Sequence, residues 1–102
     1  MTSLHKVIEV FTEVSDATTM KRLFEEVFTP AEIQDVALRW RLMTMLHDGI
    51  SQRQIASELK ISLCKITRGS KVLKRRNSVS KKILDFTKGA NHASREKTRK
   101  PA

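Results

Sequence analysis

The sequence predicts an all-α protein of six short helices that includes a helix-turn-helix motif. Apolar residues recur at three- and four-residue spacings along most of the chain, and no stretch alternates as a β-strand does. The segments TPAE and SQRQ each carry a Thr or Ser followed three residues later by Glu or Gln, which is a capping box. With 102 residues, 39% of them hydrophobic, the chain has the size of one domain with a modest core.

The first two helices are expected to be amphipathic. Leu, Val, Ile and Phe recur with a helical period over residues 4–14, and a second apolar stripe covers residues 20–28. Asp16, Thr18 and Thr19 are alternative N-caps for the second helix. The two stripes are wide for a monomer of this size, so we expect an intertwined homodimer to bury them.

A third helix is expected to begin at the TPAE segment and to form the centre of the fold. Thr29 is its N-cap, Pro30 takes the first helical position and Glu32 completes the capping box. The helix runs to a stop at Gly49 and is apolar around much of its circumference, as expected for a helix packed on several sides. We therefore expect Trp40 to lie in the core.

Two further helices joined by a short turn predict the helix-turn-helix. Ser51 and Gln54 open the first of them, and Ser62 can cap the second, which is expected over residues 63–74. The residues expected to hold the two helices at an angle are small or apolar: Ile55, Ala56, Leu59, Ile61 and Ile66. Lys60 stands in the turn where glycine is usual, which predicts an unfavourable backbone conformation. An ordinary αα-corner is the alternative interpretation of this pattern.

A last helix and a basic tail complete the chain. Apolar residues support a helix over residues 78–89, whereas the segment ANHASREKTRKPA is polar, basic and aperiodic. We therefore expect a helical domain over residues 1–89 and a basic disordered tail over residues 90–102. The tail either adds nonspecific affinity for DNA or has no measurable role.

Charge is distributed unequally along the chain. Residues 1–50 contain five basic and eight acidic residues, a net charge of −3, whereas residues 51–102 contain fifteen basic and three acidic residues, a net charge of +12. A basic half suits a polyanion, because Lys and Arg that neutralise phosphates release condensed counterions. Double-stranded DNA is therefore the expected partner of residues 1–89, and a solvated basic surface is the alternative.

Other classes of function lack their sequence signals. Cys64 is the single cysteine, so no internal disulfide is expected, and the three histidines have no metal-ligand spacing. Without a phosphate-binding glycine loop or a nucleophile motif, we expect neither an enzyme nor a metal site. No apolar run resembles a signal peptide or a membrane span, which favours a cytoplasmic protein without a membrane partner.

A helix-turn-helix that binds DNA points the N-terminal residues of its second helix toward the bases. In this chain those residues are Leu63, Cys64, Lys65 and Thr67. Gln52 and Arg53, at the start of the first helix, are expected near the phosphates. Further phosphate contacts, which position the protein without reading sequence, are expected from Lys74, Arg75, Arg76, Lys81 and Lys82.

The chain resembles the tryptophan repressor family from about residue 29 to residue 74. The resemblance is carried by three segments: TPAE followed by LRWR, SQRQIASEL, and ITRGSKVLK. The resemblance implies that L-tryptophan binds beneath the recognition helix at the subunit interface, with its indole between Arg39 and Arg68. It further implies that Arg68 holds the carboxylate, for which its planar fork is suited, and that Thr29 reaches the carboxylate from the partner subunit.

The resemblance also offers a reason for a glycine inside a predicted helix. Gly69 costs about 1 kcal/mol relative to alanine at such a position, and a ligand lying close to its backbone would account for it. Two positions depart from the family pattern. Val72 replaces a serine near the ligand's ammonium group, and Glu26 replaces a leucine whose backbone carbonyl contacts the same group. The carbonyl of Glu26 can still contact the ammonium group, and its carboxylate can replace the serine hydroxyl that is lost at Val72. An aromatic α-amino acid, tryptophan first, is therefore the expected ligand.

The sequence and the resemblance together predict a transcriptional repressor of tryptophan synthesis or transport genes, with L-tryptophan as corepressor. One alternative is a constitutive or differently gated helix-turn-helix regulator that does not bind tryptophan. Another is a protein-interaction or architectural module that binds DNA without sequence preference. A repressor should prefer its operator over random duplex by roughly a thousandfold or more, whereas such a module should not.

Overall fold

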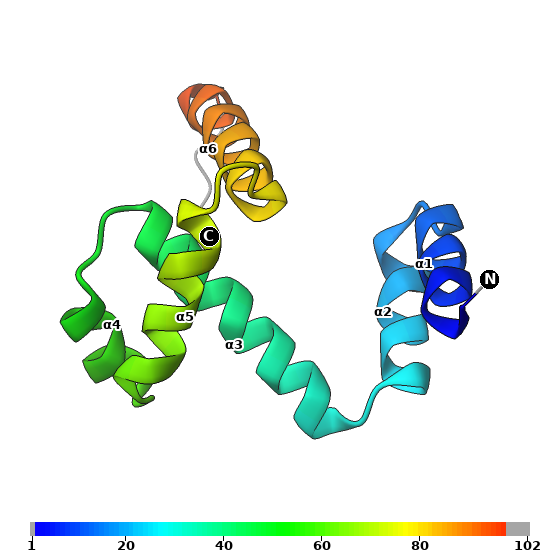
Figure 1. The fold of residues 1–102 in the computed structure, drawn as a ribbon. Coiled ribbons are helices and arrows are strands. Elements are labelled where there is room, and N and C mark those ends of the chain that lie inside the picture. Colours follow the sequence, from blue (N-terminus) through cyan, green and yellow to red (C-terminus); the bar gives the residue numbers. More distant parts are fainter. Residues whose placement is uncertain (1, 98–102) are drawn as a thin grey trace. The chain divides into compact units, whose positions relative to one another are not determined.

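The computed structural model describes residues 2–97, and over that range every regular element is an α-helix (Figure 1). Its six helices are α1 (Ser3–Glu13), α2 (Ala17–Val27), α3 (Pro30–His47), α4 (Gln52–Leu59), α5 (Leu63–Lys74) and α6 (Val79–Lys97). The predicted all-α class is therefore confirmed. The chain divides into two compact units, residues 1–37 and residues 38–102, and α3 runs through the division.

The first unit contains α1, α2 and the first two turns of α3. The hydroxyl of Thr2 accepts a hydrogen bond from the His5 backbone N–H at 3.0 Å, and the carboxylate of Asp16 accepts one from the Thr19 backbone N–H at 2.8 Å. Asp16 is thus the N-cap of α2, and this hydrogen bond lowers the pKa of its carboxyl group. Three aromatic rings join α1 to α2, with centroids 5.1 to 6.2 Å apart: Phe11, Phe24 and Phe28.

No residue of α1 or α2 is buried within the single chain, although both helices carry apolar faces. Leu4, Val7, Ile8 and Val27 are among the large apolar side chains that remain exposed. The expectation that Trp40 lies in the core is wrong for the single chain, in which its side chain is 41% exposed. Much apolar surface of this protein is therefore open to a further partner.

The capping of α3 agrees with the prediction at both ends. The Glu32 backbone N–H donates to the Thr29 hydroxyl at 3.2 Å, and the Thr29 backbone N–H donates to the Glu32 carboxylate at 2.9 Å. At the other end Gly49 adopts a φ of +91°, and the Ile50 backbone N–H reaches back to the Met45 carbonyl, as in a Schellman motif. A positive φ of this size favours glycine, which explains the helix stop.

The second unit has a small core to which four helices contribute. Its buried apolar residues are Leu42 and Met43 of α3, Ile55 of α4, Ile66 of α5 and Leu84 of α6. Gly69 of α5 is buried as well, and a Cβ atom added there would lie 2.6 Å from Leu42 Cδ1 and 3.3 Å from Met43 Cγ. The glycine therefore lets α5 pack closely against α3, a reason that the sequence alone did not reveal.

The helix-turn-helix consists of α4 and α5, and the predicted range of its second helix, residues 63–74, is confirmed. The Ser51 hydroxyl accepts from the Gln54 backbone N–H at 3.1 Å, but the Gln54 side chain donates to Glu58. Only half of the expected capping box is therefore formed at α4. Ser62 occupies the N-cap position of α5 without a side-chain hydrogen bond. Lys60 has a φ of 56° in the left-handed region, which confirms the unfavourable backbone expected there.

Helix α6 is longer than the sequence indicated. It begins after Ser78, whose buried hydroxyl accepts from the Lys81 backbone N–H at 3.1 Å. The predicted helix end at Gly89 is wrong, because α6 continues to Lys97 through residues that were assigned to the tail. Intrahelical hydrogen bonds can carry a polar segment onward from a helix that is already nucleated. Residues 98–102, the rest of the predicted tail, lie outside the described residues.

Polar contacts connect α6 to the C-terminal end of α3. His47 Nε2 of α3 lies 2.5 Å from Asp85 Oδ1 of α6, and within α6 Lys81 Nζ lies 2.9 Å from Asp85 Oδ2. The hydrogen bond from His47 lowers the pKa of Asp85 most, and the hydrogen bond from Lys81 lowers it further. A second, longer ion pair joins Lys88 Nζ to Asp48 Oδ1 at 3.6 Å.

Candidate nucleic-acid interface and ligand cavity

The N-terminal part of α5 presents its side chains to solvent, as a recognition helix requires. Leu63, Cys64, Lys65 and Thr67 are all exposed, whereas Ile66 between them is fully buried and anchors the helix. Exposed residues on one side of a buried anchor can reach base edges in a major groove. All four residues that the sequence assigned to base contacts are therefore exposed in the first turns of α5.

The start of α4 lies against this part of α5. The Thr67 hydroxyl donates to Gln52 Oε1 at 3.2 Å, which joins a predicted base contact to a predicted phosphate contact. Arg53 follows Gln52 on α4 and is exposed. Gln52 and Thr67 are thus positioned as a pair, a relation that the sequence spacing did not indicate.

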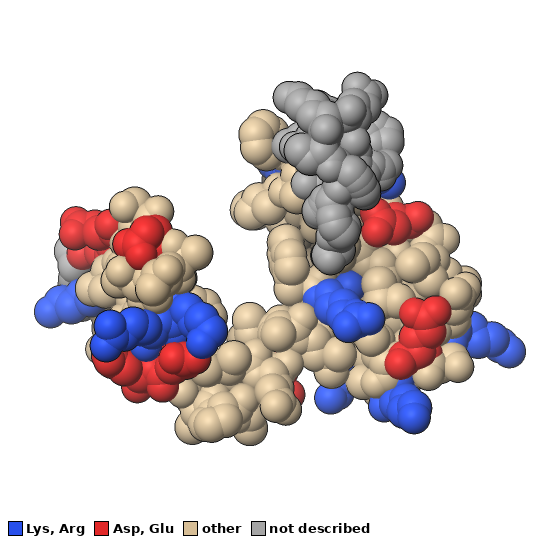
Figure 2. All heavy atoms as spheres, turned by 180° about the vertical axis from the view of Figure 1, so that it is seen from behind, with Lys and Arg blue, Asp and Glu red and all other residues tan. Residues whose placement is uncertain are grey.

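The remaining basic residues gather near the connection between α5 and α6. Lys74 ends α5, Arg75 and Arg76 follow it, and Lys82 lies in the first turn of α6. Among the described residues none of these four has an ion-pair partner, whereas Lys81 pairs with Asp85. On the face drawn in Figure 2, both basic and acidic side chains are visible on each part of the chain. The four unpaired cations thus lie close together along the chain, at the end of α5 and the start of α6.

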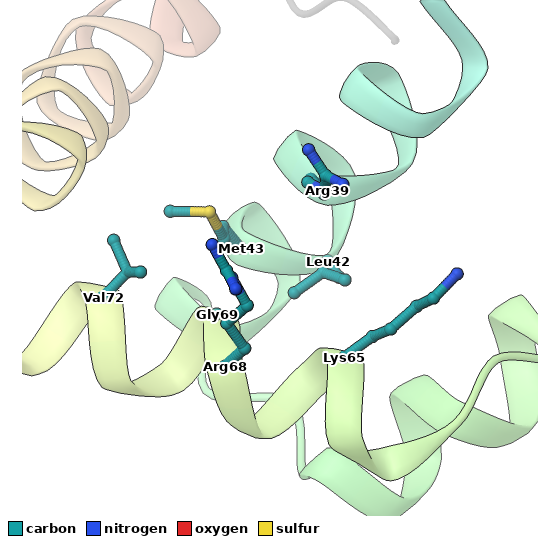
Figure 3. A pocket seen from close by; sticks show the side chains of 7 residues that line it. All are labelled: Arg39, Leu42, Met43, Lys65, Arg68, Gly69 and Val72. Atoms are coloured by element: carbon teal, nitrogen blue, oxygen red, sulfur yellow. The ribbon is translucent and has the colours of Figure 1, made fainter. Parts of the chain in front are cut away.

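A cavity of about 330 Å³ lies between α3 and α5 in the second unit (Figure 3). Its lining residues are Arg39, Leu42 and Met43 of α3 and Lys65, Arg68, Gly69 and Val72 of α5. The volume is at the lower end of the range that small-molecule sites occupy, about 300–1,000 Å³. The cavity also has their usual composition, apolar walls with a few polar groups.

Four of the six residues predicted to bind the ligand line this cavity. Arg39 and Arg68 come from opposite helices, and Gly69 and Val72 lie along α5 on the same side as Arg68 (Figure 3). Lys65, which the sequence assigned to the bases, lines the cavity too.

Two apolar lining residues were missed by sequence reasoning. Leu42 and Met43 follow Arg39 by three and four positions, so they share its face of α3. This spacing could have indicated that both residues lie beside Arg39 at the ligand site, but in the sequence analysis it was used only to predict the helix.

Thr29 and Glu26 are not among the lining residues of the cavity. Both belong to the first unit, where Thr29 caps α3 and Glu26 lies near the end of α2. The family resemblance assigns Thr29 to the ligand of the partner subunit, so its role and that of Glu26 stay predictions. Within the chain, the hydroxyl of Thr29 has a structural task of its own.

An all-α chain with a helix-turn-helix, an exposed recognition helix and unpaired cations beside it defines a helix-turn-helix DNA-binding protein. The family model described as "Trp repressor protein" matches residues 2–88 of the chain. The protein belongs to this family, which comprises regulators of transcription and not enzymes.

Named relatives agree with the family match. Proteins from three strains of Xylella fastidiosa, each named "Trp operon repressor homolog", are 33% identical to this chain over 81 residues. The matched region covers 78% of this chain and 83% of each relative. No solved structure matches the chain.

The described part of the chain contains no helix that is long and apolar enough to cross a membrane.

Proposed function

We propose that this protein is a homodimeric, cytoplasmic repressor that binds operator DNA when L-tryptophan occupies the cavity between α3 and α5. The observation that carries the proposal is the placement of Arg39 and Arg68 on opposite helices around one cavity on the inner side of the recognition helix (Figure 3). A ligand held there is in contact with both α5 and α3, the helix against which α5 packs.

The chemistry of the lining suits an aromatic carboxylate. The guanidinium of Arg68 can donate two parallel hydrogen bonds to a carboxylate, and planar guanidinium groups stack on aromatic faces. Leu42, Met43 and Val72 supply apolar surface for an indole ring. Thr29 of the partner subunit is assigned to the carboxylate of this ligand, and Glu26 to its ammonium group.

Ligand binding is coupled to DNA binding through the position of α5. A dimer reads two half-sites about 34 Å apart only if its two recognition helices stand at that spacing. Tryptophan shifts the population of this arrangement by its differential affinity for the two states. Because the cavity is lined by α5 itself, an occupied cavity can favour one position of this helix.

Base contacts and phosphate contacts are assigned to residues according to their exposure and charge. We assign base contacts to Leu63, Cys64, Lys65 and Thr67, which are exposed at the start of α5. Phosphate contacts are assigned to the following residues: Gln52, Arg53, Lys74, Arg75, Arg76, Lys81 and Lys82. Genes for tryptophan synthesis or transport are the proposed targets.

The homodimer is supported by the apolar surface of the first unit. Neither α1 nor α2 has a buried residue in the single chain, and Trp40, in the second unit, is 41% exposed as well. A second copy that covers these faces would supply the interior that the unit lacks. Sedimentation equilibrium should therefore give twice the mass of the chain, and a monomer at micromolar concentration would contradict this part of the proposal.

The test of function is a selection of bound sequences from a random duplex library, with and without tryptophan. A tryptophan-gated repressor should enrich a palindromic site only when tryptophan is present. Enrichment in both conditions would indicate a constitutive regulator, which the aliphatic Val72 in the cavity favours. Absence of any enriched site would indicate an architectural module.

A further inference from the structure

We propose that Gln52 and Thr67 recognise an adenine of the operator as one pair, in which Gln52 fixes the direction of the Thr67 hydroxyl. This inference rests on the proposed function, because it concerns a base contact of the same recognition helix. It goes beyond that function by naming the base that one position of each half-site should carry.

Thr67 uses its hydroxyl differently from two other threonines that lie within helices. The hydroxyls of Thr12 and Thr44 donate to the backbone carbonyl four residues back in their own helix, at 2.7 Å and 2.9 Å. This is the usual hydrogen bond of a helical threonine. The Thr67 hydroxyl donates instead to Gln52 Oε1 of α4 at 3.2 Å, fifteen residues away in the chain. The contact with α4 therefore sets the direction of this hydroxyl.

Buried residues hold the two partners in place. Ile66 directly precedes Thr67 on α5, and Ile55 follows Gln52 by three positions on α4. Both isoleucines are fully buried in the same core. Gln52 itself is half-buried, whereas Thr67 is exposed. The pair is thus fixed to the core and remains accessible to DNA at Thr67.

The shared hydrogen bond limits what each side chain can offer to a base. A threonine hydroxyl has one hydrogen and two lone pairs, and the hydrogen of Thr67 is engaged by Gln52, so Thr67 Oγ1 can only accept. The amide nitrogen of Gln52 keeps two hydrogens, of which one can donate to a base and the other to a phosphate. The pair therefore presents one acceptor beside one donor. If the amide turns over, the two roles are exchanged and the pair still presents one of each.

Adenine is the base whose major-groove edge matches such a pair. It carries the N7 acceptor beside the N6 amino donor, whereas guanine carries two acceptors, cytosine a donor, and thymine an acceptor with a methyl group. Thr67 Oγ1 then accepts from the N6 amino group, and Gln52 Nε2 donates to N7. A guanine in the same place would set its O6 acceptor against Thr67 Oγ1, and both oxygens would lose water without gaining a hydrogen bond.

The first test selects bound sequences from a random duplex library in the presence of tryptophan, with the parent protein and two variants. The parent should enrich adenine at one position of each half-site. Thr67→Val keeps the shape and removes the hydroxyl, so it should lose the preference at this position and keep the preferences at all others. Thr67→Ser keeps the hydroxyl and is the matched control, which should retain adenine.

The outcomes of this selection separate the inference from the proposed function. An enriched site at which Thr67→Val changes no adenine preference would overturn the inference but leave the proposed function intact. Absence of any enriched site with the parent protein would refute both.

The second test removes one group at a time from that adenine in a synthetic operator. 7-Deazaadenine lacks the N7 acceptor, and unsubstituted purine lacks the N6 amino group. Each replacement should weaken binding of the parent by about fivefold, the usual effect of one hydrogen bond. Gln52→Met has a similar length and no donor, so it should be insensitive to 7-deazaadenine, and Thr67→Val should be insensitive to purine. If 7-deazaadenine weakens Gln52→Met as much as the parent, Gln52 does not contact N7 and the inference is wrong.

Discussion

Replacing Gly69 by alanine tests whether close packing of α3 against α5 is the reason for the glycine. The added Cβ would lie 2.6 Å from Leu42 Cδ1 and 3.3 Å from Met43 Cγ. Leu42 is only 2% exposed, so its side chain has little room to move away. Overpacking of this kind costs about 1–3 kcal/mol, whereas alanine in a helix interior gains about 1 kcal/mol over glycine. We therefore expect Gly69→Ala to lower the free energy of unfolding by about 1 kcal/mol.

The assay is urea denaturation followed by far-UV circular dichroism, with all variants at one protein concentration because the stability of a dimer depends on concentration. A second background separates the clash from helix propensity. Leu42→Val removes the Cδ1 atom that the new Cβ would meet, and on that background Gly69→Ala should stabilise the protein by about 1 kcal/mol. If Gly69→Ala stabilises the parent protein by the same amount, α3 and α5 do not need a glycine at their contact and our reasoning fails.

Three further predictions concern ligand, DNA and stability. Arg68→Ala should weaken the binding of carboxylate ligands by about 1.5–3 kcal/mol and make DNA binding insensitive to these ligands. Lys74→Ala should weaken binding to all DNA sequences alike and reduce the slope of log affinity against log salt by about 0.9. Identical behaviour of the two variants in ligand and DNA titrations would contradict the assigned roles. The hydrogen bonds from His47 and Lys81 lower the pKa of Asp85 in the folded protein, so this group stabilises the fold above the ordinary aspartate pKa of about 3.9 and loses that effect as the pH falls below it. The stability difference between the parent and Asp85→Asn should therefore shrink below about pH 4 in acid-range denaturation curves, and a pH-independent difference would count against the contact. Lys60→Gly should raise the free energy of unfolding by about 1 kcal/mol, because it relieves a left-handed backbone at φ 56°; an unchanged urea midpoint would show that the turn is not strained.

Local signals in the sequence predicted the helices well. The capping box of Thr29 and Glu32, the stop at Gly49 and the range of α5 depend on residues within a few positions of one another, and all three are found in the structure. The strained backbone of Lys60 was predictable for the same reason. Local patterns suffice where the stabilising interactions are themselves local.

Features that depend on tertiary contact were predicted less well. Trp40 sits in an apolar helix and was expected in a core, yet within one chain nothing covers it fully. The length of α6 was underestimated, because Gly89 and the polar residues after it resemble a helix end although the helix continues.

The candidate site shows the same limit. Arg39 and Arg68 were found by resemblance, whereas Leu42 and Met43 needed the cavity between two helices to be seen. Gly69 was noticed as unusual, but the contact with α3 that explains it could not be read from spacing along the chain.

The hydrogen bond from Thr67 to Gln52 has a consequence for how this protein can diverge. A residue that reads DNA and is held by a neighbour cannot change its base preference independently, because a substitution at either position frees the other to rotate. With Thr67 proposed as a base contact, base preference at this part of the operator would depend on two positions, fifteen residues apart in the chain. Descendants of this protein that come to recognise a new operator should exchange residues 52 and 67 jointly.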